Sequence, residues 1–327
     1  MGLILFVSLI TLLSAQAAFA ATITLNSTCS FAEAVAWIND SGAGQSGCTK
    51  SGSFGDDDTI IVGLNNQEFT IDSSVEIKKS LTVKGWSIYG TLKTTDPAIS
   101  PAIKIAAQDI SVLFSAVIIR GVPGNMTTGF LVDGTADTHD AFTSKLTLLA
   151  SRITGFRRSG IFINQGGVNL RNATFDDNSN LGPPYVGGAI RIETATTFGR
   201  LEAEESFFSG NTAERGGAIY NDGVLNMTDC RFYDNVATKA GGGGSGGVVF
   251  AVEPEVNYYT AFNLSCDFHG NRADAGGFAI AAGPRIEFSG DTPFTGSDNT
   301  SGTDDPPKLC EDPVGQQAVD PPGCYLP

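Results

Sequence analysis

Residues 208–219 read FSGNTAERGGAI, and both halves of this segment recur along the chain. The first half is the pattern F-x-x-N, found at Phe175/Asn178, Phe208/Asn211, Phe232/Asn235 and Phe268/Asn271. The second half is a glycine pair before a short apolar run, as in GGAIRI, GGAIYN, GGVVF and GGFAIAA from Gly187, Gly216, Gly246 and Gly276. Such internal similarity is typical of a solenoid.

The residue types in the repeat have a physical reason. Residues two apart in a strand share a face, so each Phe is expected to point inward together with a small residue two positions earlier. Those small residues are Ala173, Ser206, Cys230 and Cys266. The Asn at the strand end tolerates left-handed geometry, and its amide can stack on the next Asn. The glycine pairs permit positive φ at the following corner. A narrow tube, filled coil by coil, is the expected result.

The remainder of the sequence has the same character. Of 327 residues, 40 are Gly and 21 are Phe, and charged residues make up only 17%. Short β-rich runs such as DTIIV, EFTI and KLTLLASRITG end in Gly or a polar turn. An antiparallel sandwich would require tight hairpin signals, which are rare here. The sequence therefore predicts an all-β protein, a right-handed parallel β-helix (solenoid) of about ten coils over residues 58–290.

The two ends differ from this middle. Residues 1–20 are apolar and finish with A-F-A before Ala21, as a cleaved signal peptide does, with an uncleaved anchor as the alternative. No later stretch is long enough to span a membrane. Residues 21–57 are expected to form an N-terminal cap with a short helix within 27–39, started by Thr28 or Ser30. Residues 291–327, rich in Pro, Asp and Gly, are expected to form an irregular tail.

Six cysteines behind a signal sequence favour disulfides. Cys29 and Cys48 lie near one end of the chain and Cys310 and Cys324 near the other, so each pair is expected to close a local loop. Cys230 and Cys266 occupy the same position in neighbouring repeats. Export favours a bond between them, and two buried thiols are the alternative. A metal site is not expected, because no C-x-x-C occurs and only His139 and His269 are available.

The formal net charge of −15 excludes the nucleic-acid backbone as an expected partner, since binding to it depends on Lys and Arg. The glycine-rich run Gly241–Gly247 lacks the Lys-Ser/Thr ending of a phosphate-binding loop. No cofactor is therefore expected.

Two resemblances to known families follow from these motifs. The run CSFAEAVAWIN from Cys29, with GDDDTIIV from Gly55, resembles the CSLREA-type segment that opens many exported β-helix proteins. The F-x-x-N and GGAI repeats resemble those of chlamydial polymorphic outer membrane proteins. The second resemblance implies surface display and adhesion.

Residues that could carry chemistry are few. Arg157 and Arg158, in GFRRSG, are candidates for binding an acidic polymer, with surface solvation as the alternative. Asp176 and Asp177 could serve acid–base hydrolysis of a glycoside. The equivalent positions in other repeats vary, as solvated turns do, and this favours the turn interpretation over the catalytic one.

The sequence therefore favours a secreted or cell-surface protein that presents a recognition surface without catalysis. Its expected partner is an extracellular glycan or a neighbouring cell surface, and the expected role is adhesion or carbohydrate binding. One alternative is an extracellular polysaccharide lyase or glycoside hydrolase on the same fold. Another is a structural component of an envelope, wall or sheath.

Overall fold

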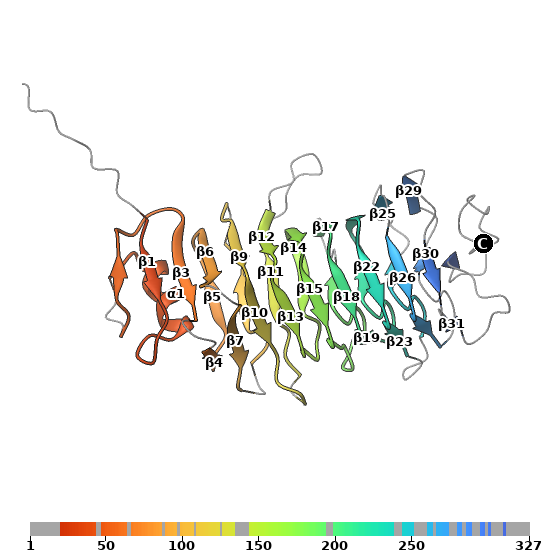
Figure 1. Cartoon of the computed structure of the whole chain (residues 1–327), viewed down its shortest axis with the longest axis horizontal. Coiled ribbons are helices and arrows are strands. Elements are labelled where there is room, and N and C mark those ends of the chain that lie inside the picture. The colour runs from red at the N-terminus through yellow and green to blue at the C-terminus, as the bar shows by residue number, and fades with distance from the viewer. Residues whose placement is uncertain are drawn as a thin grey trace, which may run out of the picture.

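The chain folds into an elongated parallel β-helix whose coils stack in sequence order along the long axis (Figure 1). The computed structural model describes residues 20–43, 47–63, 67–86, 89–96, 99–107, 109–124, 126–134, 144–193, 199–238 and 244–251, and then 260–263, 266–274, 280–282, 286–289, 295–297, 300–301 and 310–311. Each complete coil contributes one strand to each of three faces. Among the described strands of the three faces, the coils pair in parallel, as the repeat pattern predicts.

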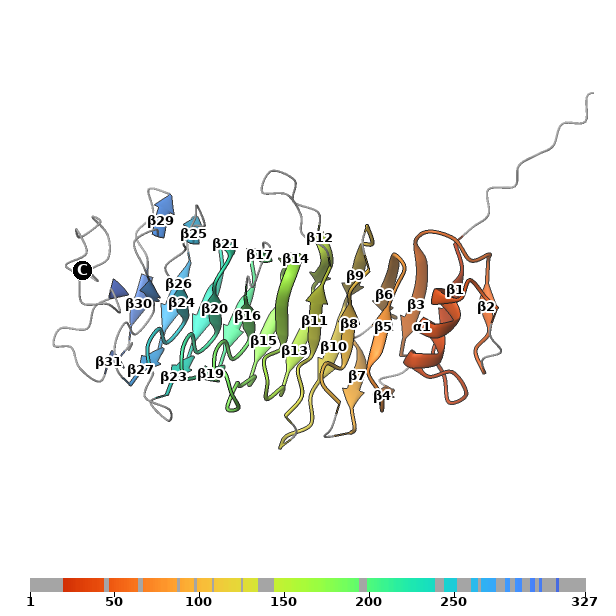
Figure 2. The same cartoon turned by 180° about the vertical axis from the view of Figure 1, so that it is seen from behind.

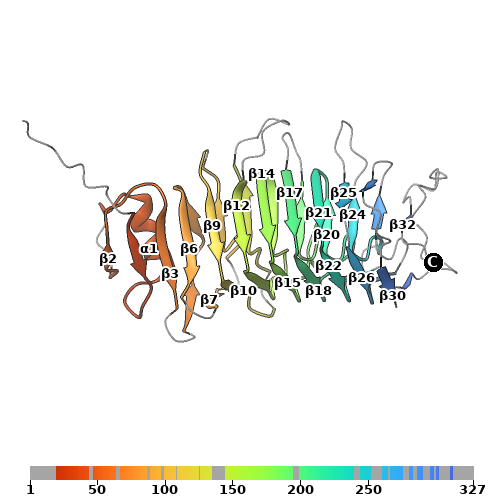
Figure 3. The same ribbon diagram turned by 45° about the horizontal axis from the view of Figure 1, so that its top comes forward.

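The first face, called the β6 face, is seen in Figure 3. It contains β1 (Thr22–Thr24), β3 (Asp58–Val62), β6 (Leu81–Gly85), β9 (Val112–Ser115), β12 (Ser144–Leu149), the second part of β14 (Ile161–Arg171), β17 (Gly199–Glu204), β21 (Val224–Thr228), β25 (Thr260–Asn263) and β29 (Ile286–Ser289). At its start, β2 (Lys50–Ser51) pairs with β1 in the antiparallel direction.

The second face, called the β10 face, is a nine-stranded sheet. It contains β4 (Glu68–Ile71), β7 (Gly90–Thr94), β10 (Val117–Arg120), β13 (Arg152–Thr154), β15 (Thr174–Asp176), β18 (Phe207–Ser209), β22 (Arg231–Tyr233), β26 (Asp267–His269) and β30 (Thr295–Ser297). Beside it runs a four-stranded strip of β19 (Thr212–Ala213), β23 (Val236–Ala237), β27 (Arg272–Ala273) and β31 (Thr300–Ser301).

The third face, called the β16 face, completes each coil. It contains β5 (Val75–Ile77), β8 (Ile103–Ile105), β11 (Phe130–Asp133), the first part of β14, β16 (Ile190–Ile192), β20 (Ile219–Asn221), β24 (Val249–Ala251), β28 (Ile280–Ala282) and β32 (Cys310–Glu311). Parallel pairing extends beyond the expected residues 58–290 at both ends, through β1 and through β30–β32. These short strands lack an obvious repeat motif, so the sequence pattern missed them.

Helix α1 (Phe31–Asn39) lies at the N-terminal end of the β-helix (Figure 2), where it contacts β4 and β5. Ser30 is its N-cap: the Ser30 hydroxyl accepts the Glu33 backbone N–H at 3.2 Å, and the Glu33 carboxylate accepts the Ser30 N–H at 2.8 Å. The Ser30 bonds lower the pKa of Glu33. Phe31, Ala34, Val35 and Ile38 are buried, so the apolar stripe of the helix covers core that the first coil would otherwise expose.

The inward phenylalanines of the repeat form a continuous stack. The ring centroids of Phe175, Phe208, Phe232 and Phe268 are 5.2, 5.0 and 5.1 Å apart in succession, with interplanar angles of 9°, 11° and 7°. All four side chains are completely buried. The spacing of the rings follows the spacing of paired strands, about 4.8 Å, because the β10-face strands are in register.

A second ladder runs along the repeat asparagines. Each of the side chains of Asn178, Asn211 and Asn235 donates to the side-chain oxygen of the next Asn at 2.9–3.1 Å, ending at Asn271. The same oxygen accepts the backbone N–H of the preceding Asn. These buried polar groups are therefore hydrogen-bonded, as a dry interior requires.

The corners are turned by single residues with positive φ. The first glycine of each pair has this geometry at Gly187, Gly216 and Gly246, with φ of 62–67°. At the asparagine corner, however, the left-handed residue is the one before the Asn: Asp177, Gly210, Asp234 or Gly270. The expectation that the Asn itself takes this geometry is therefore wrong. Turning the chain one residue earlier directs the amide inward, where it joins the ladder.

The cysteines behave in two ways. Cys29 and Cys48 form a disulfide with a Cα–Cα distance of 4.5 Å, which ties the start of α1 to the loop after it. Cys230 and Cys266 lie in adjacent coils, and the Asp267 N–H donates to the Cys230 carbonyl at 2.9 Å. They are buried thiols, and the favoured bond between them is not present. In-register strands direct both side chains the same way, which suits a disulfide poorly. Cys324 lies outside the described residues, so the expected Cys310–Cys324 bond stays a prediction.

Candidate functional site

The four candidate residues from the repeat turns lie near one corner of the β-helix, but they do not converge. Asp176, on β15, is nearly buried and accepts two hydrogen bonds of 2.6 Å from the Arg152 guanidinium on β13. The Thr154 hydroxyl donates to the same carboxylate at 3.0 Å. The hydrogen bonds to Asp176 raise the pKa of Arg152. Asp176 is therefore an ion-pair partner between coils, whereas Asp177 is exposed in the following turn.

Arg157 and Arg158 are consecutive, yet they line different hollows. The Arg158 backbone is held by a bridge to Asn180, by its N–H to the Thr127 carbonyl at 3.1 Å, and by the Thr128 hydroxyl, which donates to the Arg158 carbonyl at 2.9 Å. This anchored turn directs the Arg158 side chain toward the β16 face and leaves Arg157 on the other side, near Asp177. The basic pair of the sequence is thus divided.

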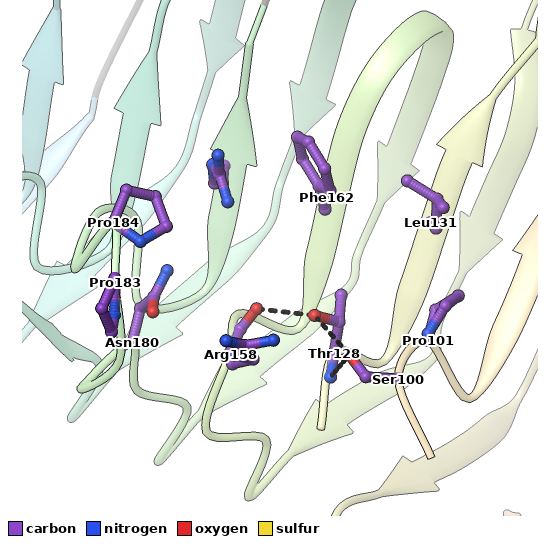
Figure 4. Close-up of a pocket in the computed structure, with 10 residues that line it drawn as sticks. Ser100, Pro101, Thr128, Leu131, Arg158, Phe162, Asn180, Pro183 and Pro184 are labelled. Carbon is purple, nitrogen blue, oxygen red and sulfur yellow. Dashed lines mark hydrogen bonds between the residues drawn. The ribbon is translucent and has the colours of Figure 1, made fainter. Parts of the chain in front are cut away.

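The hollow that contains Arg158, called the Arg158 hollow, has a volume of about 230 Å³ (Figure 4). Its floor comes from three neighbouring strands: Leu131 on β11, Phe162 on β14 and Arg191 on β16, which pair directly with one another. Its walls come from the corner loops before β8, β11, β14 and β16, and contain Ser100, Pro101, Thr128, Arg158, Asn180, Pro183 and Pro184. Sheet and corner loops together define the shape.

The charge of the Arg158 hollow is positive. The Arg191 guanidinium lies 4.4 Å from the centroid of the Phe162 ring and pairs with Glu193, which is not among the lining residues. Arg158 is exposed, and among the described residues no carboxylate pairs with it. No lining residue is acidic. An exposed arginine without an ion-pair partner presents donors in the fork geometry that matches a carboxylate or sulfate.

The floor of the hollow continues along the β16 face through residues at equivalent positions of the next strands. Arg191 pairs in register with Tyr220 on β20, and Tyr220 with Phe250 on β24. The Tyr220 and Phe250 rings are 5.8 Å apart and nearly parallel, and the Arg215 guanidinium lies 5.4 Å from the Phe250 centroid. Burial raises the pKa of Tyr220, and the Asp222 and Glu193 carboxylates raise it further against the effect of Arg215 and Arg191. We call Leu131, Phe162, Arg191, Tyr220 and Phe250 the β16-face ladder.

The second hollow, called the Asp177 hollow, has a volume of about 490 Å³. It contains Arg120, Arg157 and Asp177, together with the exposed side chain of Leu181. Arg120 pairs with Glu68 at 3.0 Å, so its charge is already compensated. Asp177 sits in a left-handed turn, and a Cβ at Gly210 in the next coil would lie 2.9 Å from its carboxylate. Gly210 thus makes room for the Asp177 side chain.

Sequence reasoning identified Arg158 but missed Phe162 and Arg191. Both point outward from strands in which inward and outward side chains alternate. The sequence does contain a signal for them, because an aromatic residue and a cation stand at equivalent positions of IFINQ and IRI. Recognising it requires the strand register, which the irregular loop lengths conceal. Within the described residues, no group of three or more His, Cys, Asp or Glu side chains could hold a metal ion, and no helix is long and apolar enough to cross a membrane.

Comparisons with known proteins bear on one repeat and on the fold. The profile of the Chlamydia polymorphic membrane protein (Chlamydia_PMP) repeat matches residues 205–222, which contain Phe208, Asn211 and the Gly216 pair. The resemblance drawn from the sequence is therefore confirmed for that copy. No curated protein matches the chain. Among solved structures, the pectin methylesterase from Aspergillus niger is similar, with 11% identity, a TM-score of 0.39, and coverage of 80% of this chain and 82% of that one. A likeness at this level carries no argument about activity.

Proposed function

We propose that this protein is a secreted or cell-surface β-helix that binds glycans through the Arg158 hollow and the β16-face ladder, without transforming them. The observation that carries the proposal is the composition of the hollow. The hollow contains the Phe162 ring, Arg191, which pairs with Glu193, and Arg158, which has no carboxylate partner among the described residues. No lining residue is acidic, in a chain with a net charge of −15. A ligand with an anionic group would meet favourable local charge there, in a chain that is acidic as a whole.

The residue types suit a sugar that carries a carboxylate or sulfate. The face of an aromatic ring is electronegative, so Phe162 and Tyr220 could stack against the C–H groups of a pyranose. Arg158 could form a two-pronged hydrogen bond with the anionic group, and the Thr128 hydroxyl and Asn180 amide could meet sugar hydroxyls. All these groups rest on paired strands or anchored turns, so little order would be lost on binding.

Location at the cell surface or outside the cell has its own support. The leader predicted at residues 1–20 directs the chain to export. The Cys29–Cys48 disulfide suits an oxidising compartment. The repeat matched at 205–222 belongs, by its description, to a membrane protein of Chlamydia.

Polysaccharide cleavage is a second candidate, favoured by the Asp177 hollow. An exposed carboxylate lies there with two guanidinium groups, Arg120 and Arg157, which is a composition that acid–base chemistry on an acidic sugar could use. Its weakness is that the adjacent Asp176 is fully occupied by Arg152 and Thr154, which leaves Asp177 without a second carboxylate from the repeat turn.

The two candidates are separated by one experiment. The purified protein would be passed over immobilised acidic polysaccharides and over neutral ones, and both retention and soluble products would be measured. We expect retention on acidic chains without product release. Arg158→Ala should weaken binding about 10-fold or more, the loss expected for a charge-assisted hydrogen bond.

Arg157→Ala is the matched control, since this neighbouring arginine lines the other hollow, and its retention should change less than about 2-fold. Equal losses in the two variants would contradict the assignment to the Arg158 hollow. Product release that disappears in Asp177→Asn would reverse the ranking in favour of catalysis.

A further inference from the structure

A completely buried carboxylate, that of Asp58, lies near the N-terminal end of the β-helix. Asp58 is the first residue of β3, and its side chain points inward between the coil of Ala21 and that of Leu81. Its Oδ1 accepts the backbone N–H of Ala21 at 2.8 Å. Its two oxygens also accept the N–H of Gly55 at 3.3 and 3.4 Å. Ala21 itself is completely buried.

This carboxylate has no cationic partner among the described residues. A buried charge that meets only neutral donors is unfavourable, because amide dipoles replace only part of its hydration. Asp176, another buried carboxylate, differs from Asp58 because it pairs with Arg152. Asp58, a completely buried carboxylate, therefore lacks a compensating positive charge among the described residues.

The missing charge can come from the chain itself. The small-x-small step A-F-A predicts cleavage of the leader between Ala20 and Ala21. Hydrolysis of that peptide bond by a signal peptidase consumes one water molecule. The Ala20 carbonyl becomes a carboxylate on the released leader, and the Ala21 nitrogen becomes an amine that takes up a proton. That nitrogen already lies 2.8 Å from the Asp58 carboxylate.

We propose that cleavage after Ala20 creates an ion pair between the α-ammonium group of Ala21 and Asp58, and that this pair locks the first coil. A neutral hydrogen bond becomes a charge-assisted one at the same distance, which is the stronger kind. Ala20 is exposed, so its removal opens a path for water to the other ammonium protons. Leader removal would then complete the N-terminal end, where β1 pairs with β3.

The surrounding contacts support a fixed position for this nitrogen. The Ala21 carbonyl accepts the Thr59 N–H at 2.8 Å, and the Leu25 N–H donates to the Ile61 carbonyl at 3.0 Å at the other end of β1. The new terminus would therefore be held by backbone bonds on the strand that it begins. The proposal depends on the position of cleavage and is independent of glycan binding.

The test compares two otherwise identical chains. One begins at Ala21, and the other carries a single additional Gly before Ala21, which moves the charge outward and restores an amide at this nitrogen. We expect the chain that begins at Ala21 to have a Tm higher by roughly 3 °C or more. Asp58→Asn should abolish the difference between the two chains, whereas Asp56→Asn, an exposed carboxylate in the same turn, should preserve it.

Two further measurements keep the proposal testable if Asp58→Asn folds poorly. The α-amine of the chain that begins at Ala21 should react with an acylating reagent at least about 10-fold more slowly in the folded than in the urea-unfolded protein. Intact mass of the protein exported with its own leader should correspond to a start at Ala21. Equal Tm values with and without the additional Gly, a freely reactive amine, or cleavage at another bond would each overturn the proposal.

Discussion

The side-chain oxygen of Asn211 accepts two hydrogen bonds from Asn178 in the preceding coil, one from the backbone N–H and one from the side-chain amide, each at 3.1 Å. The Asn211 amide in turn donates to the Phe175 carbonyl at 3.0 Å and to the Asn235 side chain at 2.9 Å. One residue thus connects three coils. The ladder ties the asparagine corner to the phenylalanine stack beside it.

Asn211→Ala should destabilise the protein by about 3 kcal/mol or more, because it removes the acceptor of two Asn178 donors and a donor to Phe175 in a dry interior. Chemical denaturation measures this change. Asn169→Ala, on the outward side of β14, is the matched control and should lie within about 0.5 kcal/mol of wild type. Similar losses of unfolding free energy at both positions would show that the asparagine ladder makes no specific contribution to stability.

The repeat motif was sufficient to predict the parallel coils, the inward Phe side chains and the stacked Asn side chains, because these residue types at these spacings within each copy are what a narrow tube requires. The corner geometry was predicted correctly at Gly187 and incorrectly at the asparagines. There the left-handed residue is either Asp or Gly, and Asp177 and Gly210 do not look alike in sequence. The Arg158 hollow was found only in part, because Phe162 and Arg191 meet through strand register across loops of unequal length.

Phe208→Ala should cost about 3–5 kcal/mol, since the ring is completely buried between those of Phe175 and Phe232. The adjacent Phe207 points outward on the same strand and is only partly buried. The loss of stability in Phe207→Ala should therefore be smaller than that in Phe208→Ala, and the difference between the two variants should be about 2 kcal/mol or more. Urea unfolding of both variants checks the alternation, and a larger loss at Phe207 would contradict the inward stack.

Removal of the Cys29–Cys48 disulfide should destabilise the N-terminal end by roughly 3 kcal/mol, because the bond closes a loop between residues 19 apart in sequence. The double variant Cys29→Ala/Cys48→Ala would be compared with wild type by thermal unfolding, with and without reductant. Reductant should lower the Tm of wild type and leave the double variant unchanged. Peptide mapping that links Cys29 to Cys310 or Cys324 would show a different pairing.

Tyr220 should ionise above the ordinary phenol pKa, first because of burial and then because of Asp222 and Glu193. A raised folded pKa means that the associated stability is fully present below the unfolded value of about 10 and is lost as pH rises through the folded value. Tyr220→Phe should therefore show a flatter loss of stability at alkaline pH. The pKa of Tyr220 can be measured as the difference between the absorbance titration curves of wild type and Tyr220→Phe.

Asp222→Asn should lower the pKa of Tyr220 toward its ordinary value, because one of the carboxylates that disfavour the phenolate is removed. Asp229→Asn is the matched control, since Asp229 turns another corner and does not contribute to the Tyr220 shift. An unchanged titration in Asp222→Asn would mean that Asp222 does not contribute to the raised pKa of Tyr220.

Cys230 and Cys266 should be recovered as two thiols when the protein is alkylated in urea without reductant and mapped by mass spectrometry. The reason is positional: Ala173, Ser206, Cys230 and Cys266 fill one inward column, where side chains lie parallel and a small group is what the tube accommodates. The Cys230 sulfur lies 3.4 Å from the Thr228 carbonyl oxygen and 3.5 Å from that of Ala203, and its single proton can be donated to either.

Burial raises the pKa of the Cys230 thiol, and its hydrogen bond to Cys266 adds to this, so the reactive thiolate is scarce at neutral pH. Alkylation of Cys230 in the folded protein should therefore be limited by opening of the coil and should accelerate strongly in urea. Cys230→Ala, which reproduces the residue found at position 173, should cost only about 1 kcal/mol. A Cys230–Cys266 disulfide in freshly purified protein would show instead that the column adjusts enough for the two sulfur atoms to bond.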